Sequence, residues 1–157
     1  MMKVNLQNIV DELEMRFMDA TVYYNTETGE TLNVQYDDVR MVEEDDFEEK
    51  LNNLPKWQQE HLKEVYDLEY GKQGKFVALP GYYDIQDSEI IEEFIESVKY
   101  PNKKRQLENC MWQKGMYRKF KDKLYQVGLE EEYYQFYDEK LKEIAIEWCK
   151  ENELEYE

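Results

Sequence analysis

The spacing of hydrophobic residues changes along this chain, and that change decides which fold class the chain can adopt. Residues 21–24 and 31–36 are rich in β-branched and aromatic side chains, and the turn composition of residues 25–30 predicts a β-hairpin with Gly29 at positive φ. The preceding segment has three-and-four spacing instead, which predicts a helix with one apolar side. That side carries Leu6, Ile9, Val10, Leu13 and Phe17.

The segment from residue 37 to residue 79 is expected to contain a charged connection, a helix and a strand. Residues 37–49 carry eight acidic side chains against Arg40, a net charge of −7, so we expect a solvated connection with at most one helical turn. A helix is predicted between Pro55 and Gly71. Its periodic residues are Trp57, His61, Leu62, Val65 and Tyr66. The apolar run at residues 76–79 predicts a short strand that joins the hairpin.

The C-terminal half is predicted to be helical. A first helix, capped by Asp87 or Ser88, has its apolar face at Ile90, Ile91, Phe94, Ile95 and Val98. A polar helix over residues 103–112 follows Pro101, and Gly115 separates it from a short helix that Gly128 ends. The apolar stripe of that short helix holds Tyr117, Phe120, Leu124 and Val127.

The longest predicted helix covers residues 130–152. Its expected buried stripe is Tyr134, Tyr137, Leu141, Ile144, Ala145 and Trp148. Phe136 and Ile146 lie off this stripe and indicate a second packing surface, either inside the domain or with another chain. Together these segments predict a single α+β domain over residues 1–157, with a small antiparallel sheet (hairpin plus one short strand) and a helix-rich C-terminal half.

A basic island lies at residues 99–123 of this otherwise acidic protein. It has nine Lys and Arg against Glu108 and Asp122, a net of +7, whereas the whole chain has a net charge of −17. Such segregation creates a directional field, and clustered cations complement phosphates or an acidic protein patch. The residues chosen as candidates for an anionic partner are Lys103, Lys104, Arg105, Lys114, Arg118, Lys119 and Lys121.

Two interpretations of the basic island stay open. It either binds an anionic partner or neutralises the acidic segments of its own fold through weak surface pairs. On a helical wheel Arg118 and Lys121 fall on one side of the apolar stripe and Lys119 on the other, so this helix alone is expected to present no single basic face. A ligand then needs the preceding residues Lys103, Lys104 and Arg105 as well.

Aromatic residues supply the remaining binding candidates. Trp112, Tyr117 and Tyr125 lie among the basic residues, and they either stack on nucleotides, as in single-strand binders, or belong to the core. Tyr82 and Tyr83 follow Pro80-Gly81 and form a candidate contact loop, with partial burial as the alternative.

The sequence contains no motif that dictates a reaction. His61 is the single histidine, which excludes multi-histidine metal sites, and neither Cys110 nor Cys149 has a nucleophile signature. The two cysteines are too few for a disulfide framework, and no apolar stretch is long enough to cross a bilayer. We therefore expect a cytoplasmic protein without catalytic residues, metal or cofactors and without membrane binding.

Two blocks of sequence resemble an uncharacterised family of small bacterial proteins, protein family 0158. The first block is residues 76–80 with Ile85 and residues 90–95; the second is residues 115–121 with Gly128, Tyr134, Phe136, Ile144, Ala145, Trp148 and Asn152. Departures from the family's pattern, Tyr133 for a tryptophan and Met116-Tyr117 for a smaller residue and phenylalanine, keep bulk and aromaticity. The resemblance implies no reaction, cofactor or catalytic residue.

The expected function is that of a non-catalytic cytoplasmic interaction protein with segregated acidic and basic faces, whose unknown partner is a protein rather than a nucleic acid. One alternative is a nucleic-acid-binding protein that uses residues 99–123, and another is an enzyme of unknown reaction. The off-stripe residues Phe136 and Ile146 also leave a homo-oligomer open.

Overall fold

The computed structural model describes residues 2–157 and divides them into two compact units. The sheet unit comprises the chain up to Ile85 together with Ala145–Glu157, and the helical unit comprises Gln86–Ile144. The prediction of one domain over residues 1–157 stays a prediction.

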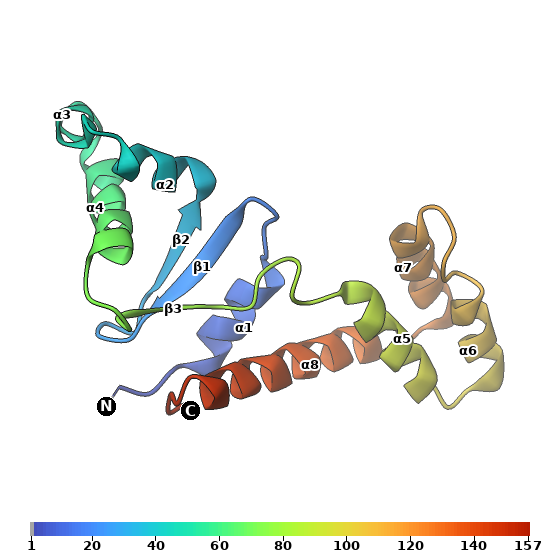
Figure 1. The fold of residues 1–157 in the computed structure, drawn as a ribbon. Helices are drawn as coiled ribbons and strands as arrows, with labels where there is room; N and C mark the ends of the chain where they lie inside the picture. The colour runs from blue at the N-terminus through green and yellow to red at the C-terminus, as the bar shows by residue number, and fades with distance from the viewer. Residues whose placement is uncertain (1) are drawn as a thin grey trace. The chain divides into compact units, whose positions relative to one another are not determined.

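The sheet unit is built on three antiparallel strands in the order β2-β1-β3 (Figure 1). The predicted hairpin is formed by β1 (Ala20–Asn25) and β2 (Thr31–Gln35), with Tyr23 opposite Leu32. Gly29 has a φ of 78° in the turn, a conformation that glycine adopts without a Cβ clash. The predicted third strand is β3 (Phe76–Ala78), and it pairs with β1, not with β2.

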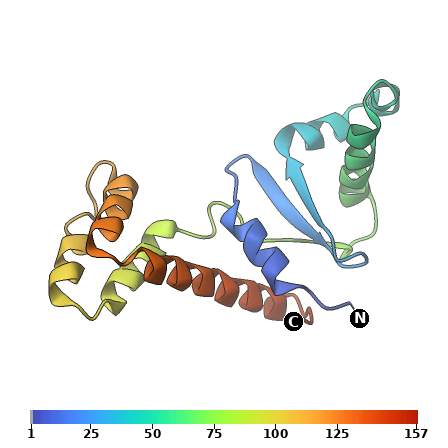
Figure 2. The same cartoon turned by 180° about the vertical axis from the view of Figure 1, so that it is seen from behind.

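Helices cover both faces of this sheet, as opposite views show (Figures 1 and 2). On one face lies α1 (Leu6–Glu14), which begins where the Asn5 side chain accepts a hydrogen bond from the Asn8 N–H at 3.1 Å. It buries the four expected apolar residues Leu6, Ile9, Val10 and Leu13. The prediction for Phe17 is wrong: the side chain is 51% exposed, because the helix ends before the helical spacing reaches it.

Most of the acidic segment at residues 37–49 is helical, so the prediction of a connection with at most one helical turn is wrong, whereas most of its carboxylates are exposed to solvent as expected. It contains α2 (Tyr36–Glu43) and the start of α3 (Phe47–Asn52). Val42, Phe47 and Leu51 are buried together with Leu62 and Val65 of α4 (Lys56–Tyr70). The carboxylates occupy the solvent side, so a few apolar residues are enough to anchor two highly charged helices.

The helix predicted after Pro55 is α4, but two of its expected apolar residues are exposed. Trp57 is 70% exposed and Tyr66 is 47% exposed, the latter with its ring stacked on Phe47. The face of α4 that packs on the core is narrower than the spacing of its apolar residues in the sequence indicates.

The end of α8 (Glu130–Glu151) completes the sheet unit. The Trp148 ring meets Tyr24 edge-on with 5.8 Å between centroids, and its indole Nε1–H donates to the Ala78 carbonyl at 2.8 Å. Backbone hydrogen bonds also join Val4 to Glu155 and Glu157, so the two ends of the chain lie together (Figure 1).

The helical unit consists of α5 (Asp87–Ser97), α6 (Pro101–Glu108), α7 (Met116–Val127) and α8 as far as Ile144. As predicted, α5 buries Ile90, Ile91, Phe94 and Ile95. The aromatic centre of this core is Tyr133, whose ring meets Phe94 at 5.2 Å and Phe120 at 5.1 Å between centroids. Burial is the main cause that raises the pKa of the Tyr133 hydroxyl.

The predicted stripe of α8 is wrong at its first position. Tyr133 is buried and Tyr134 is 47% exposed, because spacing by four residues from Leu141 and Ala145 leads back to Tyr133. Phe136 packs against Phe94 within the helical unit, at 5.5 Å between ring centroids. The second packing surface predicted from Phe136 is therefore internal to the unit. The homo-oligomer stays a prediction.

Replacing Gly128 with alanine is expected to lower the free energy of unfolding by about 1–2 kcal/mol. Gly128 ends α7 with a φ of 74°, and Leu129 N–H donates to Leu124 C=O at 3.0 Å across this turn. A Cβ is strained in that conformation. Urea denaturation measures the loss, and Gly81→Ala is the control, because the φ of Gly81 lies outside the left-handed region and the nearest atom to a new Cβ is at 3.5 Å. Equal losses in the two variants would contradict the argument.

Candidate anion-binding surface

The candidate basic residues lie on two neighbouring helices and the loop between them. Lys103, Lys104 and Arg105 are on α6, Lys114 is in the loop, and the others are on α7. Pro101 at the first position of α6 and Gly115 with a φ of 74° before α7 define where these helices begin. The two helices contact one another within the helical unit (Figures 1 and 2).

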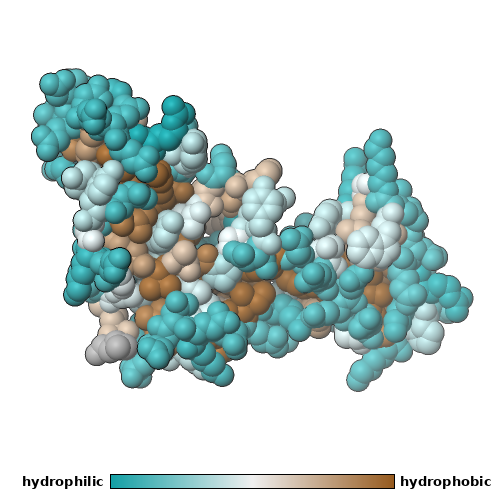
Figure 3. Space-filling model, viewed as in Figure 1, coloured by the Kyte–Doolittle hydropathy of each residue, from teal (hydrophilic) through white to brown (hydrophobic). Residues whose placement is uncertain are grey.

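The cations of the basic island have no carboxylate partners in their own unit. Among the residues that the structure describes there, Lys140 pairs with Glu93 at 2.7 Å, but none of the nine island cations forms such a pair. Arg105, Lys114, Arg118, Lys119 and Lys121 are exposed, whereas Lys103 and Lys104 are half-buried beside the buried Leu107. Hydrophilic side chains cover much of the visible surface of α6 and α7 (Figure 3).

The cations of helix α7 flank its apolar stripe on two sides, and the expectation that this helix alone presents no single basic face stays a prediction. Its fully buried residues are Phe120 and Leu124. At about 100° per residue, the charged residues from Arg118 to Lys123 lie within the remaining arc of about 200°. Within this arc Arg118 and Lys121 lie toward one edge and Lys119 and Lys123 toward the other, and Asp122 lies between the two pairs.

The three aromatic residues proposed for stacking, Trp112, Tyr117 and Tyr125, are exposed, so the alternative that they belong to the core is wrong. Trp112 is 73% exposed, Tyr125 is 77% exposed and Tyr117 is 49% exposed. The Tyr100 ring lies under the Lys103 ammonium group, 5.0 Å from its centroid. Aromatic and cationic side chains are thus available together on this surface.

A hollow of about 330 Å³ lies between α6 and α7, and sequence reasoning missed it. Lys119 Nζ donates to Gln113 Oε1 at 3.1 Å, and Lys123 Nζ donates to Gln126 Oε1 at 2.9 Å. The one signal in the sequence that pointed to this hollow is the recurrence of amide side chains among the basic residues. The lining residues are Gln106, Asn109, Cys110, Gln113, Lys119, Asp122, Lys123 and Gln126.

The predicted contact loop belongs to the sheet unit. Tyr82 is 45% exposed and Tyr83 is 69% exposed, and their rings meet edge-on with 5.1 Å between centroids. Asp84 holds the turn by accepting a hydrogen bond from the Gly81 N–H at 2.6 Å. The binding role of this loop stays a prediction.

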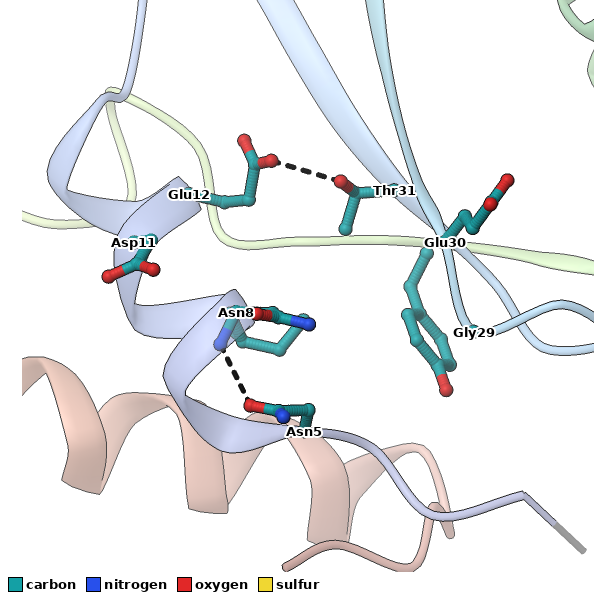
Figure 4. A pocket seen from close by; sticks show the side chains of 9 residues that line it. Asn5, Asn8, Asp11, Glu12, Gly29, Glu30 and Thr31 are labelled. Carbon is teal, nitrogen blue, oxygen red and sulfur yellow. Dashed lines mark hydrogen bonds between the residues drawn. The ribbon is translucent and has the colours of Figure 1, made fainter.

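A second hollow, of about 430 Å³, lies between α1 and the hairpin of the sheet unit and contains several carboxylates (Figure 4). Glu12 accepts a hydrogen bond from the Thr31 hydroxyl at 2.9 Å, and Asn5 caps α1. Tyr24 also lines this hollow, and burial raises the pKa of its hydroxyl. The named hydrogen bonds join a helix to a strand and close a helix end, which are structural roles.

The other reactive residues lie in structural positions. His61 Nε2 is 3.0 Å from Asp38 Oδ2, a contact that joins α4 to α2. Cys110 and Cys149 are buried free thiols, and burial raises the pKa of Cys149. Within residues 2–157, no group of three or more His, Cys, Asp or Glu side chains is placed to hold a metal ion.

Comparison with known proteins identifies the chain at the level of a family. None of the helices in the described part is both long and apolar enough to cross a membrane. No curated protein and no solved structure matches the chain. The model of the uncharacterised protein family UPF0158 matches residues 13–157, which is most of the chain. The chain therefore belongs to the uncharacterised protein family UPF0158.

Proposed function

We propose that this protein is a non-catalytic interaction protein that binds an anionic macromolecule through the basic surface of α6 and α7. The observation that carries the proposal is the set of nine cations that lack carboxylate partners within their own unit. Cations on a surface retain their field for an incoming partner when no neighbouring carboxylate offsets it. Such a surface increases the association rate and selects partners by charge.

The acidic remainder of the chain limits the choice of partner. Residues outside the island have a net charge of −24, which repels polyanions from most of the molecule. A partner must therefore carry its negative charge on a short segment that contacts only the basic island. An acidic segment of another protein meets this condition, as does a short single strand of nucleic acid.

Nucleic acid is a second candidate because of the exposed aromatic residues. Bases of a single strand stack on aromatic side chains while cations contact the backbone. Trp112 and Tyr125 are more than two-thirds exposed among the basic residues, as such a surface requires. An acidic peptide has no bases to stack on these rings.

Reversing the charge of four basic residues is expected to weaken partner binding. The test variant carries Lys103→Glu, Lys104→Glu, Arg105→Glu and Arg118→Glu. Affinity for the partner is expected to fall by about tenfold or more and to depend strongly on salt in the unchanged protein. The measurement is affinity capture from the native cell with and without nuclease, followed by identification of the retained proteins and nucleic acids.

A control variant with the same change in net charge isolates the position of the cations. It carries Lys56→Glu, Lys63→Glu, Lys72→Glu and Lys150→Glu, all at exposed positions outside the helical unit. The control is expected to retain the partners that the test variant loses. If the test variant retains the same partners as the unchanged protein, the proposed function is wrong.

A further inference from the structure

A hollow of about 510 Å³ in the sheet unit is lined by carboxylates and by tyrosine rings, and we call it the acidic hollow. We infer that the acidic hollow is a docking surface for the basic island of a second copy of this chain. The inference rests on the proposed function, because the second copy uses its basic surface of α6 and α7 for the contact. It names the anionic partner as the acidic segment of the chain itself.

The acidic hollow holds six exposed carboxylates, and most of them have no cation beside them. Lys50 pairs with Glu44 and also with Asp46, the latter at 3.6 Å. In the part of the chain that the structure describes, the other four carboxylates form no ion pair. These four are Glu43, Asp45, Glu48 and Glu49. Their negative field is therefore retained for the cations of a partner.

Aromatic rings form another part of the lining. The Tyr66 ring stacks on the buried Phe47, with 5.7 Å between centroids and 3° between the ring planes. Tyr70 lies one turn further along α4, and its ring centroid is 4.8 Å from that of Tyr66. Both tyrosines are exposed, and the faces of such rings attract ammonium and guanidinium groups. Carboxylates and rings together suit the side chains of Lys and Arg.

The basic island supplies the matching surface within the same chain. Residues 37–49 have a net charge of −7, and residues 99–123 have a net charge of +7. Among the described residues, no island cation is paired with a carboxylate. Every molecule therefore brings both halves of the contact. A basic segment of another protein has to compete with an island that is always present at the same concentration as the acidic hollow.

The net charge of −17 on each copy is compatible with this contact. At an ionic strength of about 0.15 M, the field of an exposed charge decays over about 8 Å, so carboxylates outside the contact repel the second copy only weakly. Charges that meet across the contact are partly desolvated and are screened less. At about 1 M salt the screening length falls to about 3 Å, and the attraction across the contact is expected to be lost.

The contact joins different surfaces of two copies, because the acidic hollow belongs to the sheet unit and the basic island to the helical unit. One such head-to-tail contact leaves an acidic hollow free on one copy and a basic island free on the other. These free surfaces either close a ring of copies or bind further copies. In both cases the average mass rises above that of a monomer as the protein concentration increases.

Sedimentation equilibrium of the full chain measures this mass. The unchanged protein is expected to self-associate between about 1 μM and 1 mM, the range of weak to moderate affinities. It is expected to return to the monomer in about 1 M sodium chloride. An association through apolar surfaces is not weakened by salt in this way.

Two charge-reversal variants are expected to be monomeric alone and to associate when they are mixed. The island variant carries Lys103→Glu, Lys104→Glu, Arg105→Glu and Arg118→Glu. The hollow variant carries Glu43→Lys, Asp45→Lys, Glu48→Lys and Glu49→Lys. In the mixture, each island meets a hollow of opposite charge on the other variant. Both variants keep a negative net charge, because four reversals shift the total of −17 by eight, so attraction between net charges does not produce this result.

The control for the hollow variant has the same net charge. It carries Glu60→Lys, Glu64→Lys, Glu147→Lys and Glu151→Lys, at exposed positions of the sheet unit outside the acidic hollow. This control is expected to self-associate as the unchanged protein does. The hollow variant is expected to self-associate at least about tenfold more weakly.

The role of the rings is tested by Tyr70→Leu, which keeps an apolar side chain but removes the aromatic face. Self-association is expected to weaken about two- to fivefold, as for an exposed contact between a cation and a ring. Tyr83→Leu is the control, because Tyr83 is an exposed tyrosine of the same unit that does not line the acidic hollow. It is expected to change nothing.

Circular dichroism verifies that every variant is folded. The inference is overturned if the unchanged protein or the mixture stays monomeric, if self-association survives either charge reversal, or if Tyr70→Leu has no effect. The proposed function is decided separately by affinity capture. If the chain is monomeric and capture recovers a partner that the island variant loses, only the inference is wrong. If the chain is monomeric and the island variant keeps every captured partner, both are wrong.

Discussion

Replacing Phe120 with alanine is expected to lower the free energy of unfolding by about 3–5 kcal/mol. Phe120 is fully buried in the helical unit, where its ring meets Tyr133 edge-on at 5.1 Å between centroids. Truncation removes the buried ring and leaves a cavity that neighbours on α5, α6 and α8 fill only in part. Urea denaturation monitored by circular dichroism measures the change.

The control for this prediction is Phe17→Ala, which changes the same residue type where the side chain is 51% exposed. Its expected effect is below about 0.5 kcal/mol, as for most surface substitutions. Hydrogen exchange is expected to increase in α5, α6 and α7 of the Phe120 variant, the helices that share its core. A loss below about 1 kcal/mol in Phe120→Ala would show that this ring is not part of a packed core.

Replacing Trp148 with alanine is expected to destabilise the sheet unit by a similar amount, about 3–5 kcal/mol. Trp148 is 4% exposed and contacts Tyr24 of β1, and its indole N–H donates to the Ala78 carbonyl at the end of β3. One side chain of α8 thus holds two strands of the sheet. Urea denaturation is again the measurement.

A second substitution at the same position separates packing from hydrogen bonding. Trp148→Phe keeps an aromatic ring but loses the N–H donor and part of the buried area, so the expected loss is smaller, about 1–2 kcal/mol. The matched control is Trp57→Ala, because Trp57 is 70% exposed and its removal is expected to be nearly neutral. If the two tryptophan-to-alanine variants are equally stable, the assigned role of Trp148 is wrong.

Elements with strong local signals could be predicted from the sequence. The hairpin has turn composition between two β-rich runs, α5 has one broad apolar face, and Gly128 ends α7 in the left-handed conformation. Each signal acts between residues close in the chain, so no other element has to be known. The family was also recognisable from the two sequence blocks.

The helices α2 and α3 could not be predicted, because eight acidic residues at positions 37–49 obscured their apolar anchors. Val42, Phe47 and Leu51 are too few for a clear helical period within the segment. Their burial depends on α4 and the sheet, which contact these residues only in the folded protein. Charge density alone therefore indicated solvent exposure and not secondary structure.

In the candidate site, too, some features were predictable from the sequence and others depend on the tertiary structure. The sequence identified the seven basic candidates and the aromatic residues among them, but not the hollow that Gln106 of α6 and the cap residue Asn109 form with α7. Isolated amides have no periodic signal, and their convergence depends on how two helices pack.

The sequence by itself determined the net charge, the position of the basic island, the fold class and the family, because each is a property of composition, local spacing or residue order. Only the tertiary structure decided that Tyr133 and not Tyr134 is buried, and that Trp57, Tyr66 and Tyr117 are exposed. The physical reason is that a residue at the edge of an apolar stripe is buried only if the helix or strand packed against the stripe extends far enough to cover it. The side chains that provide this cover come from residues far away in the chain.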